Sequence, residues 1–305
     1  RVSATQLQTW ASCPRGYLFK YVLGVDHEEE PERQLRINAL DRGTLFHAIL
    51  EQFICHAIDS GHPLTSWSQA DRGRLHEIAE IHFARFQREG RTGRELLWRR
   101  DRSQILAELD RTLDRDNLRL ATGLRPVAVE HHFDLVEVPV PNGNVLHVNG
   151  SIDRIDRYPD GSLEIIDYKS GNHTGYKNLT EETPHDGGKR LQLYLYALAG
   201  RLQFPEAPSV HASYWFTKTD QLIGYPVTYQ VGQIVSAAIH TIVDGIESGV
   251  FPAHPPEKDP RGWVDCWACR PDGLSSKLLR SDWNRKRHHP QLVAYAELAE
   301  PEVAE

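Results

Sequence analysis

The sequence predicts one mixed α/β domain that carries a helical insertion. Its pattern changes along the chain: residues 66–120 keep helical periodicity, whereas short runs of β-type residues begin at about residue 127. Helical segments return after those runs, and a short sheet mixed with helices is typical of the α/β class. With 305 residues, of which 40% are hydrophobic, the chain is long enough to bury one large core or two smaller ones.

The N-terminal part is expected to form two helices. Residues 3–6 fit a capping box, in which a serine and a glutamine side chain satisfy each other's backbone amides, and the helix behind it should end near Cys13. A second helix is expected after Gly43, because apolar residues recur at helical spacing over 46–57. His47 then lies on the helix directly beside the apolar face that this spacing defines.

Four strands and two amphipathic helices are expected in the second half of the chain. The strands cover 127–138, 145–156, 163–169 and 210–217. The helices cover 189–203 and 231–248, and the second of them should end at Gly249. A Pro-Asp-Gly turn at 159–161 joins the second strand to the third.

Composition and charge limit the classes of function. No apolar run approaches the roughly 18 to 20 residues that span a bilayer, and no charged-then-apolar leader opens the chain, so we expect a cytoplasmic protein without a membrane partner. The formal net charge of −7 argues against a surface that attracts nucleic acid everywhere. Two segments depart from that balance: residues 85–125 hold 11 arginines against seven acidic residues, and 270–287 hold six basic against two acidic residues. Each is either a phosphate track or a solvated helix face.

The segment 150–169 places two carboxylates opposite one another. If its strands fold back around a loop at 159–161, partner residues have numbers that sum to 320, and Asp153 faces Asp167. Cβ atoms of such a pair lie about 5 Å apart, and two like charges there are destabilising unless something compensates them. Strand alternation puts Lys169 on the face of Asp167, while Tyr168 points away and leaves its carbonyl near the pair.

A divalent cation would compensate the two carboxylates. Hard oxygen ligands of this kind suit Mg²⁺ or Mn²⁺, for which substrate phosphate and water fill the remaining positions. Such a metal polarises a phosphodiester and generates hydroxide from bound water, while a lysine stabilises developing charge, so the pattern indicates phosphodiester hydrolysis. The alternative is a solvated strand with a cross-strand ion pair, since D-x-K is a short and common pattern.

Five ordered motifs make the chain resemble the PD-(D/E)XK nucleases of the RecB-like branch, which includes the C-terminal nuclease domain of AddB-type helicase–nucleases. Three motifs are a G-x-I-D-R-x-D strand containing Asp153, a D-Y-K strand at 167–169 and a Q-x-x-x-Y helix at 192–196. Two lie upstream, namely a G-x-x-x-H helix ending in His47 and a Cys-Pro pair at Cys13. The resemblance spans residues 3 to about 290. It implies a restriction-endonuclease-like core, in which helices flank a central mixed sheet, with a helical insertion.

The resemblance also implies a metal centre. His47, Asp153 and Asp167 would bind Mg²⁺ or Mn²⁺, together with the backbone carbonyl of Tyr168. Asp153, Asp167 and Lys169 would be the catalytic residues. A histidine on the helix surface or partly buried is the plainer interpretation of His47.

Two further residues would contact DNA. Gln192 and Tyr196 would line the DNA path beside the active site, and their spacing of four puts them on one helix face. Glu130 stands where relatives often carry an acidic residue, although a plain glutamate on an edge strand fits the pattern equally well.

Members of the same branch that hold an iron–sulfur cluster have one cysteine near the domain start and three at its end, spaced C-x-x-C-x5-C. Cys13, Cys266 and Cys269 match the first three positions, whereas Ser275 occupies the fourth. The resemblance therefore implies a 4Fe-4S cluster with an incomplete ligand set, and zinc or free thiols are the alternatives. Cys55 could complete the set, but its simplest role is a small buried residue.

The leading hypothesis is a metal-dependent DNA nuclease, either an exonuclease or a single-strand endonuclease, that processes DNA ends in recombination or repair as part of a helicase–nuclease or as its partner. The alternatives are a stand-alone CRISPR-associated nuclease of spacer acquisition and a non-catalytic DNA-binding domain of the same fold. Because the chain starts at Arg1 and contains no methionine, we expect a piece of a longer polypeptide. The expected division is a nuclease domain at 1–290, with a helical insertion at about 60–125, a catalytic core at about 127–250, a cysteine segment at about 251–290, and then an acidic tail at 291–305.

Overall fold

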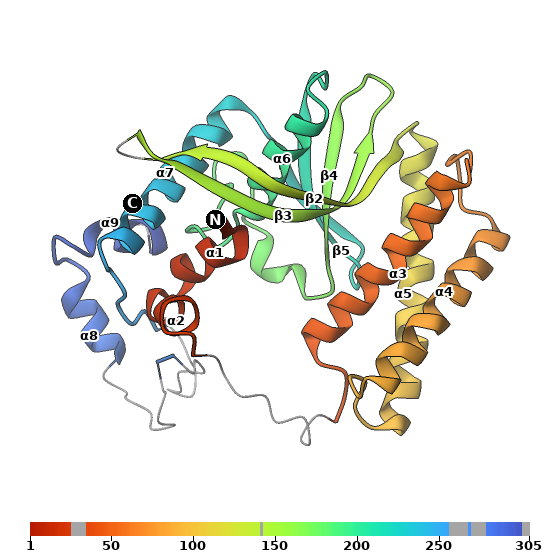
Figure 1. The fold of residues 1–305 in the computed structure, drawn as a ribbon, viewed down its shortest axis with the longest axis horizontal. Helices are drawn as coiled ribbons and strands as arrows, with labels where there is room; N and C mark the ends of the chain where they lie inside the picture. The colour runs from red at the N-terminus through yellow and green to blue at the C-terminus, as the bar shows by residue number, and fades with distance from the viewer. Residues whose placement is uncertain (26–34, 141–142, 256–267, 270–278, 301–305) are drawn as a thin grey trace.

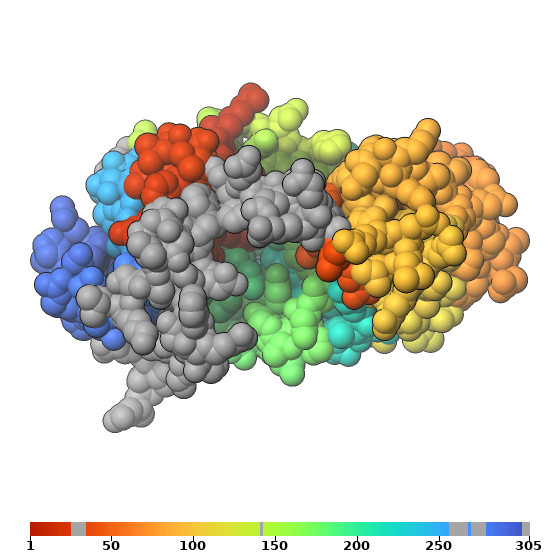
Figure 2. All heavy atoms as spheres, turned by 90° about the horizontal axis from the view of Figure 1, so that it is seen from below, coloured from red at the N-terminus to blue at the C-terminus, as the bar shows by residue number. Residues whose placement is uncertain are grey.

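The computed structural model describes residues 1–25, 35–140, 143–255, 268–269 and 279–300. A sheet crosses the middle of the molecule. Helices α3 (Ala39–Asp59), α4 (Gln69–Arg88) and α5 (Glu95–Ala121) lie at one end, and α8 (Leu279–Lys286) and α9 (Val293–Ala299) lie at the other (Figure 1). The view from below shows the same division, with α4 and α5 in orange and yellow opposite α8 and α9 in blue (Figure 2). The expected α/β class is confirmed.

The remaining helices surround the other half of the sheet. They are α1 (Ala4–Ser12), α2 (Pro14–Tyr17), the π-helix η1 (Leu18–Val22), the 3-10 helix η4 (His173–Tyr176), α6 (Gln192–Gln203) and α7 (Tyr229–Glu247). The expected capping box is present, because Oγ of Ser3 accepts the Gln6 amide at 3.2 Å and Oε1 of Gln6 accepts the Ser3 amide at 2.7 Å. In the described ranges, no helix is both long and apolar enough to cross a membrane.

The sheet is mixed. Its strands in the described residues are β1 (Val2–Ser3), β2 (Arg125–Pro139), β3 (Val145–Arg157), β4 (Leu163–Lys169), β5 (Val210–Phe216) and β6 (Gln221–Pro226). The order is β1-β3-β4-β5-β6, and β2 pairs with β3. β3 is antiparallel to β2 and β4, whereas β4 and β5 are parallel and are connected through α6. The short strands β1 and β6 are absent from the sequence-based expectation.

Alternate residues of β4 face two separate hydrophobic clusters. Leu163 and Ile165 belong to a cluster that includes residues of α1, α6 and α7. Ile166 and Tyr168 belong to a second cluster, formed with α3, α4 and α5. The expected helical insertion therefore supplies α4 and α5, which pack with α3 on one face of the sheet. Asp167 lies on the opposite face, the one that α6 covers.

Several boundaries differ from those that the pattern predicts: α6 begins at Gln192 and not at 189, and α7 begins at Tyr229 and not at 231. The helix expected after Gly43 begins at Ala39, because Oδ1 of Asn38 accepts the Asp41 amide at 2.7 Å and caps the helix earlier. The segment expected as an acidic tail contains α9, which packs against α1 and α7.

Candidate active site

The β3–β4 hairpin has the register that the sequence predicts. Its four pairs begin with Arg154 and Ile166, and the residue numbers of each pair sum to 320. The loop between the strands covers 159–161, as expected. Asp153 and Asp167 stand one residue beyond the Arg154–Ile166 pair, at the end of the hairpin away from its loop, on neighbouring strands.

Asp153 is almost buried between β4 and α3. Its Oδ2 accepts the amide of Tyr168 at 2.7 Å, and its Oδ1 lies 3.6 Å from Nδ1 of His47. Burial raises the pKa of Asp153 from 3.8 to about 7, and the charge of Asp167 adds to that rise. The fold thus holds two carboxylates together at a cost in free energy that a proton or a cation would relieve.

Asp167 and Lys169 form an ion pair on the α6 face of β4. Burial opposes the charged form of Lys169, but the charge and hydrogen bond of Asp167 together with the charge of Asp153 outweigh burial, so the pKa of Lys169 is raised and the side chain is an ammonium. Its Nζ donates to Oε1 of Gln192 at 3.0 Å, and Nε2 of Gln192 donates to the hydroxyl of Tyr196 at 3.3 Å. Gln192 and Tyr196 therefore hold the lysine in place, and Tyr196 itself is only 8% exposed.

α3 brings His47 to the same place. Its Nε2 lies 2.9 Å from the carbonyl oxygen of Tyr168, which can only accept, so Nε2 carries the hydrogen. Nδ1 then presents either a second hydrogen or a lone pair toward Asp153. In the neutral histidine, a lone pair and a carboxylate oxygen face one another, and a shared cation would stabilise that arrangement. The structure thus brings His47, Asp153 and the Tyr168 carbonyl together.

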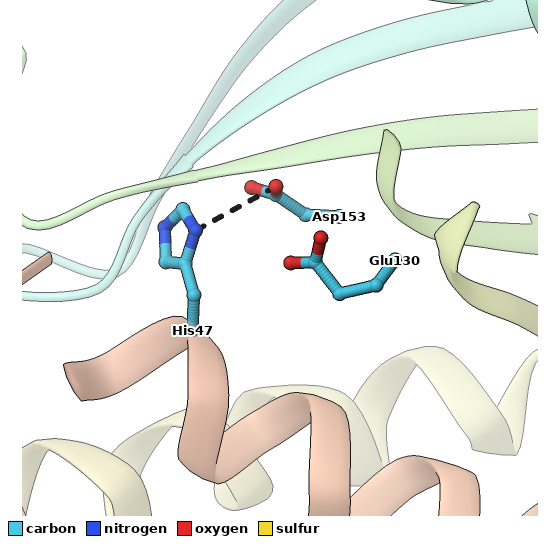
Figure 3. Close-up of side chains that lie close together, drawn as sticks. All are labelled: His47, Glu130 and Asp153. Carbon is cyan, nitrogen blue, oxygen red and sulfur yellow. Dashed lines mark ion pairs between the residues drawn. The ribbon is translucent and has the colours of Figure 1, made fainter. Parts of the chain in front are cut away.

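Glu130 approaches this group from β2 (Figure 3). Val129 and His131 both pair with β3, so Glu130 stands opposite Asp153 in the register. The φ angle of Glu130 is +42°, a left-handed conformation that residues with side chains rarely adopt. Oγ of Ser151 donates to Oε2 of Glu130 at 2.9 Å, which orients the carboxylate.

His47, Glu130 and Asp153 are the one group of three potential metal ligands found in the part of the chain that the structure describes. One ligand atom from each lies within 4.8 Å of the others. Asp167 lies outside this group, and its carboxylate pairs with Lys169. We call these five residues, His47, Glu130, Asp153, Asp167 and Lys169, the active-site cluster.

The other face of the same hairpin carries a second set of charges. Arg154 is 1% exposed and donates to Asp116 at 2.7 Å and to Asp156 at 2.6 Å. Arg119 donates to Asp156 at 2.7 Å and to Glu164 at 3.2 Å. These five residues form the buried ion-pair network, which joins α5 to β3 and β4. Sequence patterns predict no role for them, and the nearest signal is the arginine and second aspartate of the G-x-I-D-R-x-D motif.

Two of the predicted cluster cysteines lie in described residues. Cys13 follows α1, and its Sγ accepts the Gly16 amide at 3.3 Å. A Cβ placed on Gly16 would lie 3.4 Å from that Sγ and 3.7 Å from the Cβ of the residue before Cys269, so both ends of the domain pack beside Gly16. Cys269 is buried. Cys266 and Ser275 lie outside the described residues.

Comparisons with known proteins identify relatives of this chain. Three curated relatives are named as subunits of an ATP-dependent helicase/deoxyribonuclease. The protein from Lacticaseibacillus casei (strain BL23) is 28% identical over 190 residues, covering 56% of this chain and 15% of the relative. The protein from Lachnoclostridium phytofermentans is 29% identical over 182 residues, which cover 55% of this chain and 14% of the relative. The protein from Moorella thermoacetica is 26% identical over 221 residues, which cover 68% of this chain and 18% of the relative.

The chain therefore spans less than a fifth of the length of these relatives. A family model covers far more of it: the model of the PD-(D/E)XK nuclease superfamily matches residues 1–271. That match includes the whole active-site cluster and the hairpin that carries it. The chain belongs to the PD-(D/E)XK nuclease superfamily.

Proposed function

We propose that the protein is a metal-dependent DNA nuclease that hydrolyses phosphodiester bonds when DNA ends are processed in recombination or repair. The observation that carries the proposal is the pair of carboxylates, Asp153 and Asp167, held on adjacent strands beside His47 and Lys169. A solvated ion pair, the plainer interpretation of the D-x-K pattern, is disfavoured because Asp167 is 3% exposed and burial raises the pKa of Asp153 to about 7. The names of the relatives support DNA as the substrate and a helicase as the partner.

Mg²⁺ or Mn²⁺ is the cofactor that we propose. His47, Asp153, Asp167 and the carbonyl of Tyr168 would hold it, and the donor set fits a hard divalent cation because three of its four members are oxygen ligands. The imidazole nitrogen that faces Asp153 at 3.6 Å is the fourth donor. A bound metal would polarise the phosphodiester and lower the pKa of a water molecule.

The protein's own side chains would orient the reacting groups. Lys169 carries a positive charge beside Asp167 and would stabilise negative charge that develops on the phosphate. Gln192 fixes the position of that ammonium through a hydrogen bond of 3.0 Å. Gln192 and Tyr196 thus act as positioning residues, and their direct contact with DNA stays a prediction.

The proposal is tested with Asp167→Asn and Lys169→Ala on labelled linear DNA in the presence of Mg²⁺ or Mn²⁺. We expect each change to lower the cleavage rate by at least about 100-fold, because each removes a charge at the reacting phosphate. Loss of activity in buffer that contains a chelator, and its return on adding metal, would be the second readout.

Glu137→Gln provides the matched control, since Glu137 is exposed on β2 and lies outside the active-site cluster. It should cleave DNA at the parent rate. Full activity in Asp167→Asn would refute the site assignment. A parent protein that binds DNA but never cleaves it would favour the non-catalytic DNA-binding domain.

We also propose that Cys13, Cys266 and Cys269 hold a 4Fe-4S cluster that joins the two ends of the domain. The packing of both ends beside Gly16 supports this arrangement. Cys55 lies on α3, and burial raises the pKa of its thiol, which disfavours a role as the fourth thiolate. Anaerobic purification followed by iron analysis and visible absorption tests the proposal, and a colourless, iron-free protein would contradict it.

A further inference from the structure

Many of the arginines in the segment 85–125 are neutralised by carboxylates of the fold. Five of its arginines pair with carboxylates, namely Arg85, Arg91, Arg99, Arg102 and Arg119. Arg125 donates to backbone carbonyl oxygens instead. Arg111 differs from these residues, because it forms no ion pair with any residue that the structure describes, and it lines a cavity.

This cavity lies between the start of α3, the middle of α5 and the turn that follows β5, and its volume is about 540 Å³. Four cations line it against two carboxylates: Arg36, Arg42, Arg111 and Lys218 against Asp101 and Glu108. We call it the basic cavity. Its charged side chains therefore leave an excess of two positive charges.

The hydrogen bonds of the basic cavity are incomplete as well. Arg36 pairs with Asp101 at 2.5 Å, and Arg42 pairs with Glu108 through Nη2. Nη1 of Arg42 is buried and has no hydrogen-bond partner among the described residues. An unsatisfied buried donor costs free energy, and a bound acceptor would remove that cost. Lys218 pairs with no carboxylate in the described ranges.

The basic cavity adjoins the active-site cluster. Lys218 comes two residues after Phe216, which pairs with Lys169 across the parallel strands β4 and β5. The intervening Thr217 donates its amide to the carbonyl of Lys169 at 3.1 Å. On α3, Arg42 precedes His47 by five residues, which is about 7.5 Å along a helix axis. A group in the cavity would thus lie beside the segments that carry Lys169 and His47, outside the group of potential metal ligands.

We propose that the basic cavity binds a backbone phosphate of the DNA strand, away from the scissile bond. The inference rests on the proposed function, because a DNA strand seated on the active-site cluster continues past it with further phosphates. A phosphodiester carries one negative charge and accepts hydrogen bonds from a guanidinium fork and an ammonium group, which Arg42, Arg111 and Lys218 offer. Such a contact positions the strand and reads no sequence.

Binding of a labelled single-stranded oligodeoxynucleotide in the presence of a chelator tests the proposal, with fluorescence anisotropy as the readout. The double variant Arg111→Ala/Lys218→Ala should bind about tenfold more weakly than the parent, because it loses two cations that contact a phosphate. It should also depend less on salt concentration. The slope of log K against log salt concentration should become shallower by about 0.7 for each lost contact. Both side chains are exposed, so the fold should survive.

Arg88→Ala/Arg100→Ala is the matched control. It removes two exposed arginines from the same segment, neither of which lines the basic cavity. Its affinity and salt slope should stay near those of the parent. Equal weakening in both double variants would overturn the proposal, because the effect would then be one of overall charge. Binding of inorganic phosphate that the oligonucleotide does not displace would overturn it too.

Cleavage assays separate this inference from the proposed function. With Mn²⁺, the cavity variant should show a raised KM and an unchanged kcat, because the lost contact holds substrate and transition state equally. If the parent protein cleaves DNA and the cavity variant binds DNA as tightly as the parent, the proposal of phosphate binding in the basic cavity is overturned and the proposed nuclease function is not. A parent protein that does not cleave DNA would refute the proposed nuclease function. A DNA-binding defect confined to the cavity variant would still support phosphate binding in the basic cavity.

Discussion

The two faces of the β3–β4 hairpin carry two clusters of charge that differ in how they are satisfied. In the buried ion-pair network, Asp156 accepts hydrogen bonds from both Arg154 and Arg119, so each charge has an opposite charge beside it. In the active-site cluster, Asp153 receives one backbone amide and faces a second carboxylate. Asp153 and Asp156 of one strand thus point into two environments that differ in the cations supplied to a buried carboxylate.

The pKa values follow this difference only in part, because burial raises the pKa of Asp156 even though Arg154 and Arg119 lie beside it. For Glu164 in the network, burial opposes ionisation, but hydrogen bonding to His211 and the charge of Arg119 outweigh burial and lower the pKa to about 2. For Asp153 in the active-site cluster, burial and Asp167 raise the pKa to about 7. The network's carboxylates face arginine cations that the fold itself supplies, whereas two carboxylates of the active-site cluster lie beside one another and would be relieved by a bound cation. We infer that the second condition marks the functional face.

Removing one member of the network should have the largest effect on stability. Arg154→Leu would leave Asp116 and Asp156 buried without their cation, and we expect a loss of about 3–5 kcal/mol in the free energy of unfolding. Denaturation in urea would measure it. Arg99→Leu is the control, because Arg99 and Glu95 form an exposed pair whose loss should cost less than about 1 kcal/mol. Similar losses in both variants would show that the network contributes no more to stability than an exposed ion pair does.

The active-site cluster should respond in the opposite direction. Asp153→Asn in the presence of a chelator should stabilise the fold by roughly 1–3 kcal/mol at about pH 8, because the variant no longer buries a second carboxylate. The folded pKa of about 7 lies above the ordinary value of 3.8, so the native state holds this proton more tightly. The cost of the carboxylate is therefore absent below about pH 4, grows between about pH 4 and pH 7, and is complete above.

Thermal or urea denaturation across that pH range would measure the gain. It should fade toward about pH 4, and Glu137→Gln should show no such trend, since Glu137 is exposed. Added Mn²⁺ should make the parent more stable than Asp153→Asn, because the metal stabilises the parent and not the variant. A variant that is less stable than the parent at about pH 8 without metal would mean that Asp153 is satisfied in the fold.

Local pattern was sufficient to predict the hairpin and the face of each of its residues. Its register depends only on the loop at 159–161 and on strand alternation, so the proximity of Asp153 and Asp167 follows from sequence spacing. The position of Tyr168 on the opposite face of β4 follows in the same way. The helix patterns were equally local, although the cap at Asn38 moved one boundary. Interactions within one strand pair are thus accessible to sequence reasoning.

Long-range placement was not accessible in the same way. The β2–β3 pairing contains two register shifts, one after Pro126 and one after Phe133, so counting residues cannot place Glu130 opposite Asp153. The network joins Arg119 to strand residues that are 37 or more positions away. Neither contact has a periodic signal, because each depends on how α5 and β2 pack in three dimensions.

The smallest expected effect concerns Glu130, and it sharpens the boundary of the active-site cluster. If Glu130 ligates the metal or orients a ligand, Glu130→Gln should weaken Mn²⁺ binding about tenfold, or about 1.4 kcal/mol, while stability without metal changes little. Calorimetric titration with Mn²⁺ alone would measure this change. Glu51→Gln is the matched control, because Glu51 lies one turn after His47 on α3 and outside the group of ligand atoms within 4.8 Å. Equal weakening in both variants would show that only the summed negative charge matters. Weakening confined to Glu130→Gln would mean that its left-handed backbone serves to aim a carboxylate at the metal.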